Sequence, residues 1–140
     1  MKDKLNPFHL AIPVSNLEES VAYYRDTLGL REGRSSKKWA DFDFFGHQLV
    51  CHVSDSINEQ VTNPVDGEEV PIPHFGVVLS IEEFEEFLLQ INDKNIDFII
   101  KPTTRFKGEI GEQRTMFFKD PSGNAIEIKA FKDMDNLFSS

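Results

Sequence analysis

Two histidines lie at matching places in two similar segments. His9–Ser15 (HLAIPVS) aligns with His74–Ser80 (HFGVVLS) at an offset of 65 residues, histidine on histidine and serine on serine. Both segments are short and apolar, which predicts strands whose side chains alternate between two faces. His9 and Ala11 are therefore expected to point away from an apolar face made by Phe8, Leu10 and Ile12.

A carboxylate occupies a comparable position near the end of the chain. In NAIEIKAF, Ile126 and Ile128 share one face, and Glu127 points the other way with Ala125 and Lys129. An unpaired carboxylate on a buried strand would be costly. Two imidazoles and one carboxylate suit a divalent ion such as Fe(II), with further positions left for water or substrate. We predict metal ligation by His9, His74 and Glu127, although a single histidine of this kind more often makes only a hydrogen bond.

His52 is a candidate for proton transfer. In HQLVCHV it shares a face with Gln48 and Val50, and an imidazole titrates near neutral pH. We predict that His52 is a general base close to the metal, the alternative being a rim histidine with an ordinary hydrogen bond. His47 follows Gly46 directly and is expected in a turn.

Three further side chains are candidates for contact with a substrate: Gln48, Trp39 and Arg105. Trp39 alternates with apolar residues in WADFDFF, as do Asp41 and Asp43. Arg105 lies in RFKGEIGEQ, ahead of the apolar run TMFF, where a guanidinium can grip a carboxylate or simply be solvated.

The elements that must position these residues form a repeat. Ser15 and Ser80 each precede a glutamate by three places, the spacing of a helix-capping box. An apolar stripe follows each serine, and strand-like pieces ending in a glycine turn and a last strand follow each helix. Each half therefore reads as strand, helix and about three strands. The polar stretch 54–73 between them is predicted to be a linker, with a functional flap as the alternative.

Composition narrows the class of protein. At 140 residues the chain has the length of one domain, and a net charge of −9 argues against a nucleic-acid surface. The single cysteine, Cys51, is expected in the core and fits a reducing compartment. No segment has the length and apolarity of a signal peptide or a membrane span, so we expect a cytoplasmic protein with no membrane partner.

Three segments, HLAIPVSNLEESVAYYRDTLGL, HFGVVLS and DPSGNAIEIKAF, resemble the vicinal oxygen chelate superfamily over nearly the whole chain. The resemblance implies an α+β fold in which two βαβββ modules form a cupped half-barrel of mixed β-sheet with the helices outside. It implies one domain with modules at about 7–54 and 73–132 and a linker at 55–72. The family's ligand positions match His9, His74 and Glu127.

The resemblance also supplies expectations of function. DFDFFGHQLVCH and RFKGEIGEQRTMFFKDPSGNA are most similar to single-unit proteins assigned as extradiol dioxygenases. This implies a ring-cleaving oxidoreductase that uses Fe(II) and dioxygen on a catechol-like molecule, with His52 as proton acceptor, in a homodimer. Mn(II), Zn(II) and Ni(II) are alternative ions.

Three other activities of the superfamily stay open. A glyoxalase-like isomerase would place a second carboxylate where this chain has Val50. A thiol transferase of the fosfomycin-resistance kind tends to have a hydroxyl residue where this chain has Ala11. A non-catalytic pocket of the bleomycin-binding kind typically lacks the ligand set.

Overall fold

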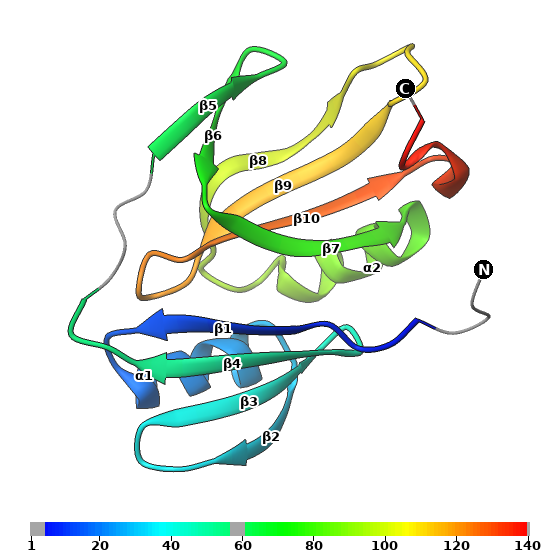
Figure 1. The fold of residues 1–140 in the computed structure, drawn as a ribbon. Helices are drawn as coiled ribbons and strands as arrows, with labels where there is room; N and C mark the ends of the chain where they lie inside the picture. Colours follow the sequence, from blue (N-terminus) through cyan, green and yellow to red (C-terminus); the bar gives the residue numbers. More distant parts are fainter. Residues whose placement is uncertain (1–4, 57–60, 140) are drawn as a thin grey trace. The chain divides into compact units, whose positions relative to one another are not determined.

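Each half of the chain folds as one strand, one helix and three further strands (Figure 1). The structure is a computed structural model that describes residues 5–56 and 61–139. Its contacts divide the chain into two units, residues 1–58 and 59–140. The predicted α+β fold with two βαβββ modules is confirmed.

The first unit contains one four-stranded sheet in the order β1-β4-β3-β2. β1 and β4 are parallel and the other pairs are antiparallel. The elements are β1 (His9–Val14), α1 (Leu17–Val21), a π-helical turn η1 (Ala22–Thr27), β2 (Arg31–Ser35), β3 (Trp39–Phe44) and β4 (His47–Val53).

The helical segment covers one face of this sheet. Tyr24 and Leu28, from the predicted apolar stripe, are buried, and the Tyr24 ring lies 5.5 Å from that of Phe42. Cys51 is buried as predicted. Phe8 is 64% exposed, contrary to expectation, because β1 begins only at the next residue and Phe8 is not part of the pleated strand.

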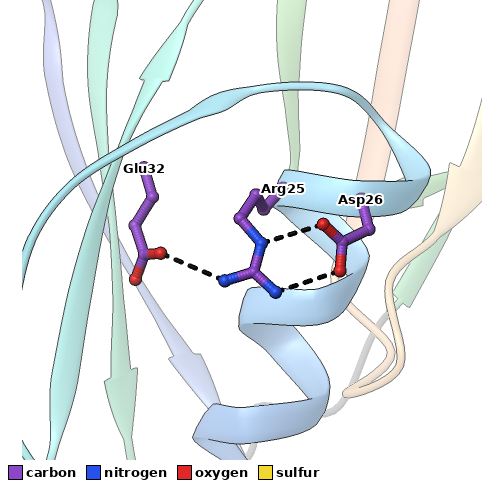
Figure 2. Close-up of polar contacts among 3 residues, drawn as sticks. All are labelled: Arg25, Asp26 and Glu32. Carbon is purple, nitrogen blue, oxygen red and sulfur yellow. Dashed lines mark hydrogen bonds and ion pairs between the residues drawn. The ribbon is translucent and has the colours of Figure 1, made fainter.

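Polar contacts fix both ends of the helical segment. The predicted cap at Ser15 is wrong, because Asn16 is the N-cap and its side chain accepts a hydrogen bond from the backbone N–H of Glu19. In the last part of the π-helical turn, Arg25 donates Nε and Nη2 to the carboxylate of Asp26, and Nη1 to Glu32 on β2 (Figure 2). Arg25 therefore links the helical segment to the edge strand β2. The edge of its guanidinium that carries Nε–H and Nη2–H is occupied by the Asp26 carboxylate.

The second unit repeats the same sheet order, β7-β10-β9-β8, with β7 and β10 parallel. Its elements are β7 (His74–Ser80), α2 (Ile81–Ile91), β8 (Asp97–Arg105), β9 (Gln113–Lys119), β10 (Ala125–Phe131) and a 3-10 turn η2 (Met134–Asn136). The predicted capping box of Ser80 and Glu83 is present, and Phe84, Phe87 and Ile91 of α2 are buried. At the turn before β10, Gly123 has a φ of 87°, which favours glycine.

A hairpin of β5 (Val61–Val65) and β6 (Glu68–Ile72) precedes β7 and belongs to this second unit. Val65 and Val70 of the hairpin pack with Ile100 and Phe117 of the sheet. The stretch predicted as a linker thus contains ordered strands that cover part of a sheet face. None of the helices within the described residues is long and apolar enough to cross a membrane.

Candidate metal centre

Glu127 lies in the middle of β10, on the sheet face opposite α2. Its direct neighbours are Gly76 on β7 and Phe117 on β9. The Glu127 side chain is only 9% exposed, and both of its oxygens have partners. The hydroxyl of Thr115 donates to Oε2 at 2.5 Å, and Nε2 of His74 lies 3.2 Å from Oε1. The second unit therefore pairs two of the three predicted metal ligands.

The tautomer of His74 follows from its other contact. Nδ1 lies 2.7 Å from the backbone carbonyl oxygen of Pro71. A carbonyl only accepts hydrogen bonds, so Nδ1 carries a hydrogen and donates it. Nε2 then has two states: it holds a second proton shared with Glu127, or it presents its lone pair to a cation beside the same carboxylate.

Electrostatics at this pair favour opposite charges. The hydrogen bond to Glu127 raises the pKa of His74 above its usual value, against the opposing effect of burial. Burial alone would raise the pKa of Glu127, but the hydrogen bonds from His74 and Thr115 outweigh it and hold that pKa below its usual value. Glu127 is thus kept as an anion, the form that binds metal.

Gly76, beside the pair, allows β7 and β10 to approach closely. A Cβ at Gly76 would overlap the backbone carbonyl oxygen of Glu127, so no other residue allows this close pairing of β7 and β10. A cavity of about 220 Å³ opens here, and its lining includes His74, Gly76, Glu127 and Lys129. Both candidate ligands therefore reach a space that a small molecule can enter.

His9, in the first unit, is oriented in a comparable way. Its Nδ1 lies 2.7 Å from Oε1 of Gln48, and Nε2 of Gln48 lies 3.2 Å from Oδ2 of Asp41. A carboxylate cannot donate, so Gln48 must turn its amide NH₂ to Asp41 and its oxygen to His9. His9 must therefore carry its hydrogen on Nδ1, which leaves the Nε2 lone pair available.

The residues present fit a divalent ion. Both histidines donate Nδ1–H to a protein oxygen, so Nε2 is the nitrogen that could bind a metal, as in the second-shell pattern of metal-ligating histidines. The carboxylate is buried, anionic and hydrogen-bonded. Within the described residues, no three His, Cys, Asp or Glu side chains are grouped so that they could hold a metal. Joint ligation of one ion by His9, His74 and Glu127 therefore stays a prediction; His9 belongs to the first unit, and His74 and Glu127 belong to the second.

The remaining predicted site residues lie at different places. The Gln48 side chain is hydrogen-bonded to His9 and does not project freely into solvent. His52 and Trp39 are register partners, and His52 is four residues along β4 from Gln48, about 13 Å at a strand's rise per residue. The structure therefore does not bring His52 close to His9. Arg105 is buried at the end of β8, on the same face as Glu127.

Some residues that shape the centre were not predicted as site residues. Thr115 donates a hydrogen bond to Glu127, Asp41 accepts one from Gln48, the partner of His9, and the Pro71 carbonyl orients His74. A signal for Thr115 existed, since in QRTMFF it alternates with Phe117 and so shares one face of its strand. No sequence signal identifies a backbone carbonyl as the partner of a histidine.

A mixed sheet of this topology, with a histidine on the first strand and a carboxylate on the last, defines a βαβββ protein with candidate metal ligands. Residues 6–128 match the family model of the Glyoxalase/Bleomycin resistance protein/Dioxygenase superfamily, and the chain belongs to that family. It is also similar, with 33% identity and a TM-score of 0.83, to a glyoxalase/bleomycin resistance protein/dioxygenase from Alicyclobacillus acidocaldarius, covering 99% of this chain and 100% of that one.

Similar proteins also include named enzymes. The metallothiol transferase FosB of Staphylococcus saprophyticus is 26% identical over 92% of this chain and 79% of its own length. FosB of Staphylococcus epidermidis is 26% identical over 92% and 86%. The fosfomycin resistance protein FosX of Listeria monocytogenes shares the fold, with a TM-score of 0.66 at 20% identity over 97% of this chain and 98% of that one.

These relatives contradict the expected ring-cleaving dioxygenase. The named relatives are thiol transferases and fosfomycin resistance proteins, and none carries an extradiol assignment of its own. The same ligand set serves several reactions, so a prediction from the ligands could not select among them. The expectations of dioxygen, of an oxidoreductase, of Fe(II) and of a catechol whose proton His52 accepts lose their support with it.

Proposed function

We propose that the chain is a divalent-metal-dependent transferase that adds a small thiol to an electrophilic small molecule. The observation that carries the proposal is the His74–Glu127 pair, with Nε2 at 3.2 Å from a buried carboxylate oxygen. The metallothiol transferases to which 92% of the chain is similar support the reaction type. His9, His74 and Glu127 are the proposed ligands.

Each residue has a defined task in this proposal. A bound divalent ion would act as a Lewis acid that polarises an oxygen of the substrate. Glu127 supplies negative charge and is held in place by Thr115, while the Pro71 carbonyl and Gln48 fix the two imidazoles. The thiol sulfur forms a bond to an electrophilic carbon, a carbon–oxygen bond breaks, and the thiol's proton ends on the released oxygen.

Two positions bear on the alternatives. Val50 is buried and aliphatic at the place where a glyoxalase would have a second carboxylate, so the isomerase gains no support. Ala11 has no hydroxyl, which departs from the expected pattern of the transferases. Any contact that such a hydroxyl makes with a substrate must here come from another residue.

Metal-reconstituted protein should be incubated with fosfomycin and a small thiol such as cysteine. We expect mass spectrometry to show an adduct with the mass of substrate plus thiol, formed only with protein and a divalent ion present. A panel of Mn(II), Ni(II), Zn(II) and Fe(II) identifies the preferred metal. His74→Ala and Glu127→Gln should abolish adduct formation, because each removes a proposed ligand.

His52→Ala is the matched control, since it removes a histidine that is exposed and distant from Gln48. Its adduct formation should equal that of the unchanged protein. If the product has the mass of substrate plus water instead of substrate plus thiol, the reaction is hydrolysis and not thiol transfer. Metal binding without any product would contradict the proposed substrate class, and the absence of metal binding would leave a non-catalytic pocket.

A further inference from the structure

Arg105, at the end of β8, is a buried cation with no ion-pair partner in the described part of the chain. It is only 5% exposed, and its Nε and Nη2 atoms are buried with no hydrogen-bond partner among the described residues. Its Cζ atom lies 5.4 Å from the centre of the Phe117 ring. A buried guanidinium whose donors stay unpaired is destabilising, so such an arrangement is retained where a ligand supplies the missing acceptors.

The two unpaired nitrogens form one edge of the guanidinium. Nε–H and the neighbouring Nη2–H point the same way and match the two oxygens of one anionic group. The same edge of Arg25 is filled by the carboxylate of Asp26, at 2.8 and 3.0 Å (Figure 2). Inside the protein, Arg105 therefore leaves open the same edge of the guanidinium that, in Arg25 at the surface, is occupied by the Asp26 carboxylate.

A second unpaired group lies beside this fork. Gln113 is the register partner of Arg105 across β8 and β9, so the two side chains share a face. Its Oε1 atom is also buried without a partner. An amide oxygen only accepts hydrogen bonds, so the site as a whole lacks two acceptors and one donor.

This polar site adjoins the candidate metal centre. Phe117 separates the two, because its ring contacts Arg105 on one hand and packs edge-on against His74, with centroids 4.9 Å apart, on the other. The β5–β6 hairpin packs on the same face through Val65 and Val70, and Asp66 at its tip accepts a hydrogen bond from the backbone N–H of Phe106.

We propose that Arg105 and Gln113 form a binding site for a small oxyanion that carries a neighbouring hydrogen-bond donor. A hydroxycarboxylate or a singly protonated phosphoryl group has this chemistry: two oxygens for the fork of Arg105, and a hydroxyl for Oε1 of Gln113. The site follows from the unpaired atoms themselves. Its use in holding the acidic group of a substrate beside the metal rests on the proposed function.

The test is a titration of metal-free protein, without any thiol, by calorimetry and by the NMR signal of the Arg105 Nε–H. The probes are inorganic phosphate, glycolate and acetate. We expect phosphate and glycolate to bind and to shift that signal, and acetate, which lacks the hydroxyl, to bind several-fold more weakly. Because neither metal nor reaction is involved, a failure of thiol transfer leaves this result untouched.

Two variants remove the site in different ways. Arg105→Met should lose at least about tenfold in affinity for phosphate and glycolate. Gln113→Glu keeps the arginine but places a carboxylate opposite it, and should fill the fork and reduce binding as strongly. Arg105→Met should also unfold at an equal or higher urea concentration, since it removes an unpaired buried charge. A residue needed only for structure would instead lower that midpoint.

Arg114→Met is the matched control. Arg114 lies on the other face of β9, over the ring of Phe84, and is paired with Glu85. Its loss should leave binding of the probes unchanged. Failure of the unchanged protein to bind any of the three probes overturns the proposal, as does undiminished binding by Arg105→Met or Gln113→Glu.

Discussion

Replacing Thr115 by valine tests whether the buried carboxylate of Glu127 serves as a metal ligand. The substitution keeps the shape of the side chain and removes only the hydroxyl that donates to Oε2 at 2.5 Å. Thr115 is fully buried, so water does not replace the lost donor. A hydrogen bond to a charged group contributes about 1.5–3 kcal/mol. Loss of an outer partner of this kind typically lowers metal affinity by about 10- to 100-fold.

Competition with a metal chelator measures that affinity, and urea unfolding of the metal-free protein measures stability. We expect Thr115→Val to bind the ion about 10- to 100-fold more weakly. Thr103→Val is the control, because Thr103 is the register partner of Thr115 on β8 and has no bond to Glu127. Unchanged metal affinity in Thr115→Val, together with lower stability, would show that Glu127 has a structural role and would refute its assignment as a ligand.

Five further predictions concern the same centre and the assembly. Gly76→Ala should destabilise the protein by about 3 kcal/mol or more in urea unfolding, because its Cβ meets the backbone of β10, whereas Gly111→Ala, with open space around it, should not. Gln48→Leu should weaken metal binding about tenfold in chelator competition, because His9 loses the acceptor that fixes its tautomer. Metal affinity should rise with pH up to the raised pKa of His74 and then level off, since a proton on Nε2 competes with the ion; calorimetry should detect the release of that proton on ion binding below this pKa. In the metal-free protein, the stability contributed by protonated His74 should be complete below the ordinary histidine pKa and be lost as the pH rises through the raised one. By resemblance we expect a homodimer, with a mass in light scattering of twice the 16.1 kDa chain.

The face of the sheet on which each strand side chain lies could be predicted, because side chains along a strand alternate with a period of two residues. Alternation placed Gln48, Val50 and His52 on one face of β4, and the pairing of these residues with His9, Ala11 and Pro13 shows the same face. It likewise separated Glu127 from Ile126 and Ile128, which are fully buried. Such patterns are robust since a shift of one residue would turn every apolar side chain outward.

Boundaries and partners were harder to predict for physical reasons. Ser15 and Asn16 are adjacent residues that both cap helices well, and only the backbone geometry selects Asn16. Thr115 meets Glu127 through the register of two antiparallel strands, which a single sequence does not state. The reaction was mispredicted because the ligands are common to several activities, whereas the substrate contacts that distinguish these activities are spread over loops and strand ends.

The two modules differ in the strand that carries a carboxylate near the candidate histidine. Val50 on β4 pairs with Ala11, and Glu127 on β10 pairs with Gly76, so valine and glutamate occupy equivalent places. In the first module the carboxylate is instead that of Asp41, which lies directly opposite Val50 and binds Gln48. A glutamate at position 50 would face Asp41 as a like charge across the strand pair, which is destabilising.

The first module therefore uses its carboxylate to orient His9 and cannot easily add a second one beside it. In the proposed ligand set, this asymmetry leaves one histidine in the first module and a histidine and a glutamate in the second, so we expect no fourth protein ligand.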